Sequence, residues 1–443
     1  MFVKNIYLIF LMIFLLSIFG GVGIAIACVF ISCFIFFEKK NIILSLFFIW
    51  FLTFLNPMLV TENEFISIFK YIVILLGFII VLFNLMLNKI LCFNKKIFIT
   101  FLIFLSILLH SIFFSIYPLI SILKIIIWYM VFFILFEVWG SISIVERKKT
   151  IDILIDLLKI ILILSVPFVF INSIGYARNE SGFQGILNHP QAFGITMAIF
   201  SILLFSKILE SKYINYYDLF FLVVAFIFIL MSQARTAALA VAISILLGLF
   251  LNILLSKNKI IFSGLLKNTR IYPLLMLLSA IFCITVLFNV DKLNSFLFKG
   301  SNAEGLQEAA VNSRGFLVER MFNNIENNPL VGIGFGIPSE YFYTKIELDP
   351  FFGIPISVLS EKGILFIAIF EELGLLLGAV VLFWFLYLIF VSAKYYFHGL
   401  LLILCILLTN LGEYMFFSVG GMGMLLLVFF TYALQKNTKL GVS

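Results

Sequence analysis

The sequence predicts an all-α, polytopic integral membrane protein with about 12–14 transmembrane helices and one large, partly helical outer loop. Three observations support this fold class. The chain of 443 residues is 64% hydrophobic and 12% charged, and its mean hydropathy is +1.22, which lies above the range of soluble globular proteins. Its apolar residues form runs as long as a bilayer crossing. One long polar stretch, residues 291–363, interrupts these runs.

A bilayer core about 30 Å thick requires about 20 apolar helical residues for each crossing. The runs that meet this requirement are, in chain order, 5–19, 21–37, 41–57, 66–87, 97–117, 119–139, 152–173, 192–208, 217–231, 236–255, 272–290, 364–392, 397–412 and 419–435. The first two runs could merge, and the run 364–392 could hold a surface helix followed by a span.

Lysine and arginine predict the orientation, because positive residues are retained on the cytoplasmic side of short loops. They fall in every second connection, at Lys4, Lys39, Lys40, Lys89, Lys95, Lys96, Arg147, Lys148, Lys149, Lys207, Lys212, Lys257, Lys259, Lys267, Arg270, Lys394, Lys436 and Lys439. Both termini are therefore expected in the cytoplasm. The stretch 291–363 is expected on the outer side, since long loops do not follow the charge rule.

No internal repeat and no linker rich in proline, glycine or serine divides the chain. We therefore expect a single membrane domain, residues 1–443, with 291–363 as a periplasmic or extracellular loop subdomain between transmembrane helices. The net charge of +7 and the pI near 9.0 do not indicate nucleic-acid binding, because the basic residues are dispersed through short inner loops. No CxxC or histidine-rich spacing predicts a metal site.

The connection 173–191 carries Arg178 and leads through His189 and Pro190 into an apolar run. Proline tolerates the first turn of a helix, so Asn188 or His189 is expected to precede a helix start. Capping of that helix is the simpler interpretation. The alternative is that Arg178 and His189 contact an anionic headgroup beside the positive end of the helix.

Arg235 lies in a very short outer turn between two spans. A lone arginine in this position could extend to lipid phosphates. Ser232, Gln233 and Thr236 beside it would form a small polar pocket, so a functional role is equally favoured.

Within the outer loop, Ser313 is expected to cap a helix of about four turns that stops at Pro329. One face of this helix would pack against the membrane domain through Phe316, Leu317, Met321 and Ile325. Arg314, Glu319 and Arg320 would lie on the polar face. The simpler interpretation of that face is solvation, with a weak pair between Glu319 and Arg320.

The glycine-rich run 331–336 lets the backbone approach a neighbour closely, although glycines alone do not identify a phosphate site. Carboxylates follow at Glu361, Glu371, Glu372 and Glu413. Such charges at a membrane surface are costly unless solvated or paired, which favours a water-filled cavity. Guanidinium groups suit phosphate, and a partly desolvated carboxylate can act as a general base. This combination predicts transfer from a lipid-linked phosphate or pyrophosphate donor.

Five short fragments follow one another on the predicted outer face. They are Asn188-His189-Pro190-Gln191 with Gly194; Ser232-x-x-Arg235-Thr236-Ala237; Ser313-Arg314 with Asn328-Pro329-Leu330-x-Gly332-x-Gly334; Glu361-Lys362-Gly363 with Glu371-Glu372-x-Gly374; and Glu413 with Phe416, Phe417, Ser418 and Gly420-Gly421. In this order they resemble the O-antigen polymerase (Wzy) and O-antigen ligase superfamily of bacterial polysaccharide assembly. The resemblance covers roughly the C-terminal 270 residues.

The resemblance implies a metal-independent glycosyltransferase with a GT-C-like membrane fold, without a cofactor, in the bacterial inner membrane. Its substrates would be oligosaccharides linked to undecaprenyl pyrophosphate, in contact with membrane lipids. A chain-length regulator and a flippase of the same pathway would be further partners. Ligases of the superfamily carry a histidine in the large loop, whereas the histidines here are His110, His189 and His398. The resemblance therefore favours a polymerase of O-antigen or capsule repeat units over a ligase.

By the same resemblance, Arg235 and Arg314 would hold the donor pyrophosphate and stabilise the leaving group. Further substrate contacts would come from Arg178, Arg320 and Glu413. Glu361 or Glu372 would deprotonate the acceptor hydroxyl, with His189 as the next candidate.

A flippase for lipid-linked oligosaccharides is the alternative from another class. It would be expected to contain pseudo-repeats and charged or broken helices at mid-bilayer. His110 and Lys159 are the deeper polar residues here, whereas Lys70 and Lys124 lie near span ends and could extend to the surface. The clustered arginines of the outer loop favour a transferase. A scaffold protein is a third, weaker alternative, since it would not need these costly charges.

Overall fold

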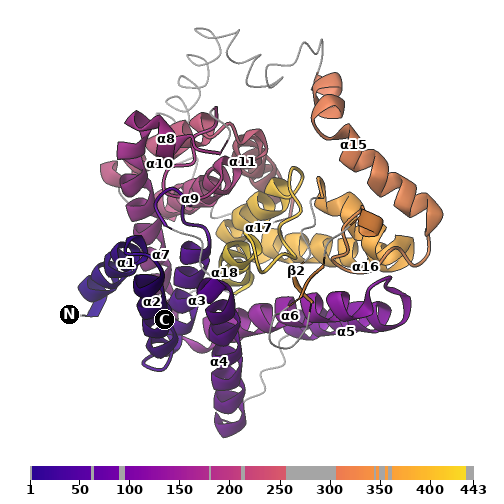
Figure 1. Ribbon diagram of the computed structural model, residues 1–443, viewed down its shortest axis with the longest axis horizontal. Coiled ribbons are helices and arrows are strands. Elements are labelled where there is room, and N and C mark those ends of the chain that lie inside the picture. Colours follow the sequence, from indigo (N-terminus) through magenta and orange to yellow (C-terminus); the bar gives the residue numbers. More distant parts are fainter. Residues whose placement is uncertain are drawn as a thin grey trace.

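The computed structural model describes residues 2–60, 64–88, 95–178, 181–210, 215–255, 306–343, 346–348, 355–357 and 362–435. These residues form α1 (Phe2–Ile18), α2 (Gly21–Phe34), α3 (Lys39–Thr53), α4 (Glu64–Asn88), α5 (Lys95–Phe114), α6 (Pro118–Ser141), α7 (Ile144–Ser165), η1 (Val166–Phe170), α8 (Asn172–Gly175), α9 (Pro190–Glu210), α10 (Tyr216–Met231), α11 (Arg235–Leu255), α15 (Leu306–Asn327), η2 (Tyr341–Tyr343), β1 (Glu347–Leu348), β2 (Pro355–Ser357), α16 (Leu365–Tyr395), α17 (Phe397–Thr409) and α18 (Gly423–Leu434). Apart from the short antiparallel pair β1 and β2, the described elements are helices (Figure 1).

Many of the described helices have the length and composition of membrane spans, which confirms the prediction of an all-α polytopic membrane protein. Seven described helices are long and apolar enough to cross a bilayer. Five more are apolar but shorter, namely Ile6–Ile18, Gly21–Phe34, Tyr216–Met231, Phe397–Thr409 and Gly423–Leu434. The predicted span 272–290 lies outside the described residues, so the range of about 12–14 spans stays a prediction.

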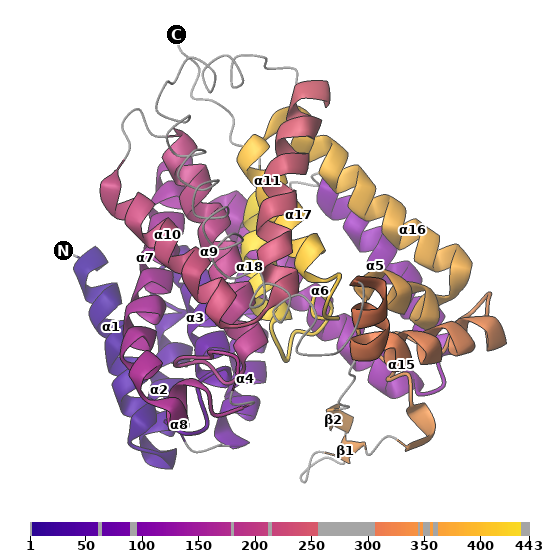
Figure 2. The ribbon, with the colours of Figure 1, turned by 90° about the horizontal axis from the view of Figure 1, so that it is seen from above.

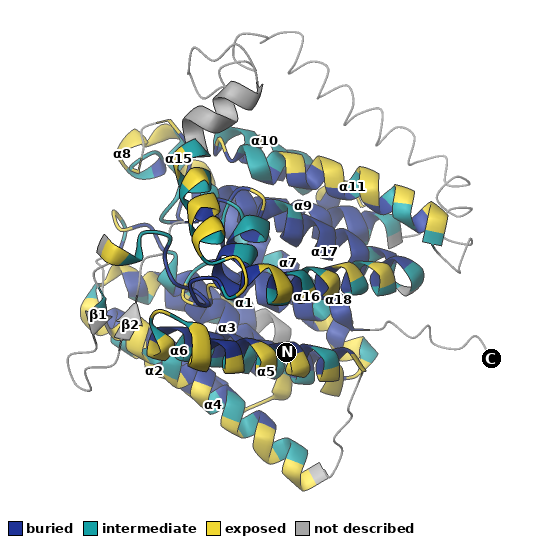
Figure 3. Cartoon of the chain, turned by 90° about the vertical axis from the view of Figure 1, so that its right-hand side faces the viewer, coloured by how far each residue is buried: buried dark blue, intermediate teal, exposed yellow. Residues whose placement is uncertain are grey.

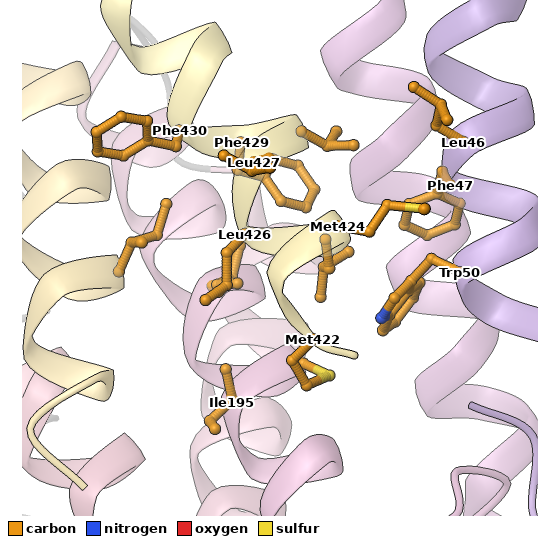
Figure 4. Close-up of a cluster of buried hydrophobic side chains, with 14 of the residues drawn as sticks. Leu46, Phe47, Trp50, Ile195, Met422, Met424, Leu426, Leu427, Phe429 and Phe430 are labelled. Atoms are coloured by element: carbon orange, nitrogen blue, oxygen red, sulfur yellow. The ribbon is translucent and has the colours of Figure 1, made fainter. Parts of the chain in front are cut away.

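The core is centred on α18, which lies inside the bundle rather than at its surface. Eleven of its twelve residues are buried, as expected for a helix that is apolar on all sides. Figure 4 shows its side chains facing Phe47 and Trp50 of α3, with Ile195 of α9 nearby. The Trp139 indole donates to the Val428 carbonyl at 3.1 Å and ties α6 to α18. The peripheral helices keep one exposed apolar face, as on α4 and α5 (Figure 3).

Helix α16 changes direction at Gly374, which has φ 72° and ψ 174°. This left-handed residue divides the predicted run 364–392 into a short first part and a longer second part. Figures 1 and 2 show α15 beside the first part of α16, at the edge of the bundle.

The predicted start of α15 is wrong, because the helix begins at Leu306 and Ser313 lies in its interior. The predicted apolar face is partly wrong as well. Met321 is fully buried, but Phe316 is 61% exposed. Val318 packs against the core in its place.

The end of the bundle that holds the start of α7 and α10 contains a network of ion pairs. Lys159 lies 2.9 Å from Asp218 and 3.2 Å from Asp156, and Lys207 lies 3.2 Å from Asp218. Tyr7 donates to Asp156 at 2.7 Å. Lys159, one of the deep polar residues of the flippase alternative, is therefore neutralised within the bundle.

Candidate active site

The opposite end of the bundle brings several connections together, and we call it the site end. Asn56 joins two of them, because its amide donates to the Ile174 carbonyl at 2.8 Å and to the Gly185 carbonyl at 2.9 Å. The Ile186 carbonyl accepts the Asn56 backbone N–H at 2.9 Å. This asparagine thus fixes the connection between α7 and α9 against the one that follows α3.

The turn that carries Arg235 is held against the same connection. The Phe183 backbone N–H donates to the Met231 carbonyl at 3.0 Å. The Gln233 side chain donates to the Ser181 carbonyl at 3.0 Å, and its backbone has φ 54°. Arg235 is half-buried at the first position of α11.

The next neighbour of this turn is the segment between α17 and α18, which carries Glu413. A Cβ atom on Gly412 would lie 2.7 Å from the Thr236 hydroxyl oxygen. The glycine therefore allows the start of α11 and this segment to touch. Arg235 and half-buried Glu413 lie one residue from this contact on their respective segments.

His189 fulfils the simpler interpretation of its segment. Its Nδ1 accepts the Gln191 backbone N–H at 3.1 Å and so caps α9, which begins at Pro190. Because Nδ1 acts as an acceptor, the proton of the neutral ring is on Nε2. Arg178 is exposed, and its backbone N–H donates to Gln184 at 3.0 Å.

The centre of the site end is a fully buried charge cluster. The Lys362 ammonium lies 2.8 Å from a Glu371 oxygen and 3.0 Å from a Glu372 oxygen. The other Glu371 oxygen accepts from the Asn324 amide at 2.7 Å, and the other Glu372 oxygen accepts from the Tyr414 hydroxyl at 2.8 Å. We call these five residues the Lys362 cluster.

The charge states of the cluster follow from burial and from the two carboxylates. Burial alone would lower the pKa of Lys362, but Glu371 and Glu372 outweigh burial and raise it above its ordinary value. Burial, reinforced by the negative charge of Glu372, raises the pKa of Tyr414 well above its ordinary value. Lys362 therefore stays charged and Tyr414 stays a neutral donor at physiological pH.

The cluster corrects the prediction of a water-filled cavity around the paired carboxylates. Glu371 and Glu372 are buried, and Lys362 offsets their charge instead of water. Both oxygens of Glu372 are engaged by protein groups in this arrangement.

The glycine-rich run 331–336 wraps around the kink of α16. The backbone N–H groups of Ile333 and Gly334 donate to the carbonyls of Glu371 and Glu372 at 2.9 Å each. A Cβ atom on Gly332 would lie 2.6 Å from the Glu371 carbonyl oxygen. The close approach predicted from the glycines is therefore an approach to protein backbone.

Helix α15 is joined to the Lys362 cluster by one side chain. Asn324, whose amide donates to Glu371, also donates to the Ser339 carbonyl at 3.0 Å. It lies one turn beyond Arg320 on the same helix. The hydrogen bond from Asn324 to Glu371 therefore fixes α15 against α16 at the site end.

Arg320 is paired differently from the prediction. It forms an ion pair with Glu340 rather than with its neighbour Glu319, and its guanidinium stacks 3.3 Å from the Phe316 ring centroid. Arg314 also lies on α15, six residues before Arg320. Glu361 lies outside the described residues.

The structure thus places Arg178, His189, Arg235 and Glu413 on three segments that touch at the site end. Glu372 is joined to the last of these segments through Tyr414.

Sequence reasoning did not assign roles to Lys362 or Tyr414. The available signal for the lysine was electrostatic, because two adjacent carboxylates in an apolar run require a nearby cation. No comparable signal marks the tyrosine, since its bond to Glu372 depends on the packing of distant segments.

Fold and site together define a polytopic membrane protein with basic and acidic groups gathered at one end of its bundle. Residues 220–370 match the family model described as O-antigen ligase. This match over about a third of the chain supports a relationship to the O-antigen ligase and Wzy superfamily, whose members are glycosyltransferase-like enzymes of the ligase or polymerase type. The matched range includes Arg235, Arg314 and Lys362 and ends one residue before Glu371. No curated protein and no solved structure matches the chain.

Proposed function

We propose that the protein is a metal-independent polysaccharide polymerase of the bacterial inner membrane. It transfers a growing glycan from undecaprenyl pyrophosphate to a new lipid-linked repeat unit on the outer face. The observation that carries this proposal is the contact, at one end of the bundle, between the segments that bear Arg178, Arg235 and Glu413, within a chain that matches a family model of this superfamily. The absence of histidine from the sequence 291–363 favours a polymerase over a ligase.

In this mechanism Arg235 and Arg314 bind the donor pyrophosphate and stabilise the charge that develops on it as the glycosidic bond breaks. Arg178, Arg320 and Glu413 supply further contacts to phosphate or sugar. The acceptor hydroxyl loses its proton to a general base as the new bond forms.

The candidates for that base are not equally suited. Glu372 has both oxygens engaged by Lys362 and Tyr414, and Nε2 of a neutral His189 carries the ring proton. These arrangements favour Glu361 as the base. Glu372 then acts by positioning the segment that carries Glu413.

Purified protein incubated with lipid-linked repeat units is expected to form a ladder of polymers without other enzymes. Arg235→Ala and Arg314→Ala should each reduce ladder formation by at least about 100-fold, because a pyrophosphate contact is lost at the developing charge. Arg235→Lys should restore only part of the activity, since an ammonium cannot replace the guanidinium fork. Chelation of metals with EDTA should leave the rate unchanged.

Lys148→Ala provides the control, because it removes one positive charge from an exposed position at the opposite end of the bundle. Normal ladders from Arg235→Ala and Arg314→Ala would contradict the proposed site. Transfer to lipid A core without ladders would identify a ligase. Movement of lipid-linked oligosaccharide across vesicles without glycan transfer would identify a flippase.

A further inference from the structure

From the sequence, Lys70 is expected to extend to the membrane surface, but its side chain is buried. It lies on α4, six residues after the helix start at Glu64, or about 9 Å along the helix axis. Its side chain is turned into the protein, since the residue is only 8% exposed. The ammonium is therefore held inside the bundle near the site end.

Lys70 also lacks the partners that the other buried lysines have. Lys362 lies against two carboxylates, Lys124 donates to the Gly336 carbonyl at 2.6 Å, and Lys96 donates to the Leu434 carbonyl. Among the residues that the structure describes, the Lys70 ammonium forms no hydrogen bond or ion pair. Its one polar interaction there is a cation–π contact with the Tyr71 ring, 4.9 Å from the ring centroid. The Lys70 residue is mostly buried. Partial removal of a charge from water is costly, so its retention favours a ligand.

The surroundings of Lys70 are suited to an anion. A Cβ atom on Gly420 would lie 3.6 Å from Nζ, and Gly420 itself is exposed. The ammonium is thus separated from the surface by a residue without a side chain. Helix α18 begins three residues later, at Gly423, with no side-chain cap, and a helix start carries partial positive charge.

The turn between Lys70 and α18 is fixed by its own hydrogen bonds. The Ser418 carbonyl accepts the backbone N–H groups of Gly421 and Gly423 at 3.1 Å each, and Ser418 is itself exposed. The positions of the helix start and of Gly420 opposite Lys70 are therefore set by backbone hydrogen bonds before any ligand arrives.

From this geometry we propose that Lys70 and the turn 418–423 bind the phosphate group of a membrane lipid. Two lipids share this chemistry, the polyprenyl phosphate carrier of the substrate and an anionic phospholipid. The first source rests on the proposed function. Gly420 follows Tyr414 by six residues, which can span at most about 20 Å, so a carrier phosphate held here would lie within one oligosaccharide of the Lys362 cluster.

The test is a titration of purified protein in uncharged detergent with undecaprenyl phosphate and, separately, with phosphatidylglycerol, followed by native mass spectrometry. Lys70→Gln is expected to weaken binding of one of these lipids by at least about tenfold, because the charge that pairs with the phosphate is lost. Lys70→Arg should retain most of the affinity. Lys148→Gln, with the same change of net charge on the exposed surface, should bind as the unmodified protein does.

The lipid whose binding falls in Lys70→Gln identifies the source of the phosphate. Equal binding of both lipids by Lys70→Gln and the unmodified protein would overturn the inference. Thermal stability without added lipid gives a second measure, because Lys70→Met should match or exceed the unmodified protein once an unpaired buried charge is removed. A marked loss of stability in Lys70→Met would show that the lysine has a partner within the protein and would also overturn the inference.

The ladder assay separates this inference from the proposed function. Weakened lipid binding in Lys70→Gln together with no polymer from the unmodified protein would leave the phosphate site intact and reject the polymerase. Ladders from the unmodified protein together with unchanged lipid binding in Lys70→Gln would support the polymerase and reject the phosphate site.

Discussion

Lys362→Met is expected to destabilise the protein so strongly that little folded protein is recovered from the membrane. Lys362 is fully buried between Glu371 and Glu372, and the substitution leaves two buried carboxylates without their cation. Removal of one partner from a buried ion pair typically costs about 3–5 kcal/mol. The measurement is the thermal midpoint in detergent, together with the yield of monodisperse protein from the membrane.

A partial rescue distinguishes electrostatics from packing in this experiment. The triple variant Lys362→Met, Glu371→Gln, Glu372→Gln removes all three charges and should regain part of the lost stability. Lys148→Met, a surface substitution of the same type, should leave the midpoint within error of the unmodified protein. A stable Lys362→Met protein would mean that the cluster contributes little to the fold.

Gly374→Ala is expected to have an effect of similar size through the backbone. Gly374 has φ 72° and ψ 174°, a conformation that is essentially confined to glycine and costs another residue about 1–3 kcal/mol. A methyl group there would also collide with the backbone of Leu330, and the surrounding hydrogen bonds of the run 331–336 prevent either chain from moving away. We expect a total loss of at least about 3 kcal/mol, measured as the thermal midpoint or the resistance to denaturant.

Gly77→Ala is the matched control for this variant. It lies in the middle of α4, where a Cβ atom would meet Ile42 and Ile134 at 3.4–3.7 Å, within or at the edge of ordinary contact. Alanine is also the better helix former by about 1 kcal/mol. Equal destabilisation by the two substitutions would contradict a special role for the α16 kink.

The membrane class of the fold could be predicted because it depends on composition and run length alone. Helix boundaries were harder, as α15 shows. Ser313 resembles a cap, yet Gln307, Glu308 and the alanines that follow favour helix before it, and the helix extends through the serine from Leu306. Phe316 is exposed and stacks against the Arg320 guanidinium instead of the bundle, a contact that hydrophobic spacing does not reveal.

The candidate site could be predicted only as far as its residue types. Arg235, Glu372 and Glu413 stand out because charge is costly in an apolar chain. Their arrangement depends on contacts between residues far apart in sequence, such as the hydrogen bond from Tyr414 to Glu372. The burial of Lys70 and Lys362 could not be predicted, because burial is a property of the tertiary fold.

The two central helices are short, and this determines how deep the site end lies. α17 has 13 residues and α18 has 12, so their lengths are about 20 and 18 Å. A bilayer core about 30 Å thick exceeds both, and the non-helical segment 410–422 between them must make up the difference. Irregular backbone at that depth is tolerated only when it is enclosed by protein or faces water. We therefore expect the segment 410–422 to lie below the headgroup level, where a lipid-linked sugar would have to descend to reach it.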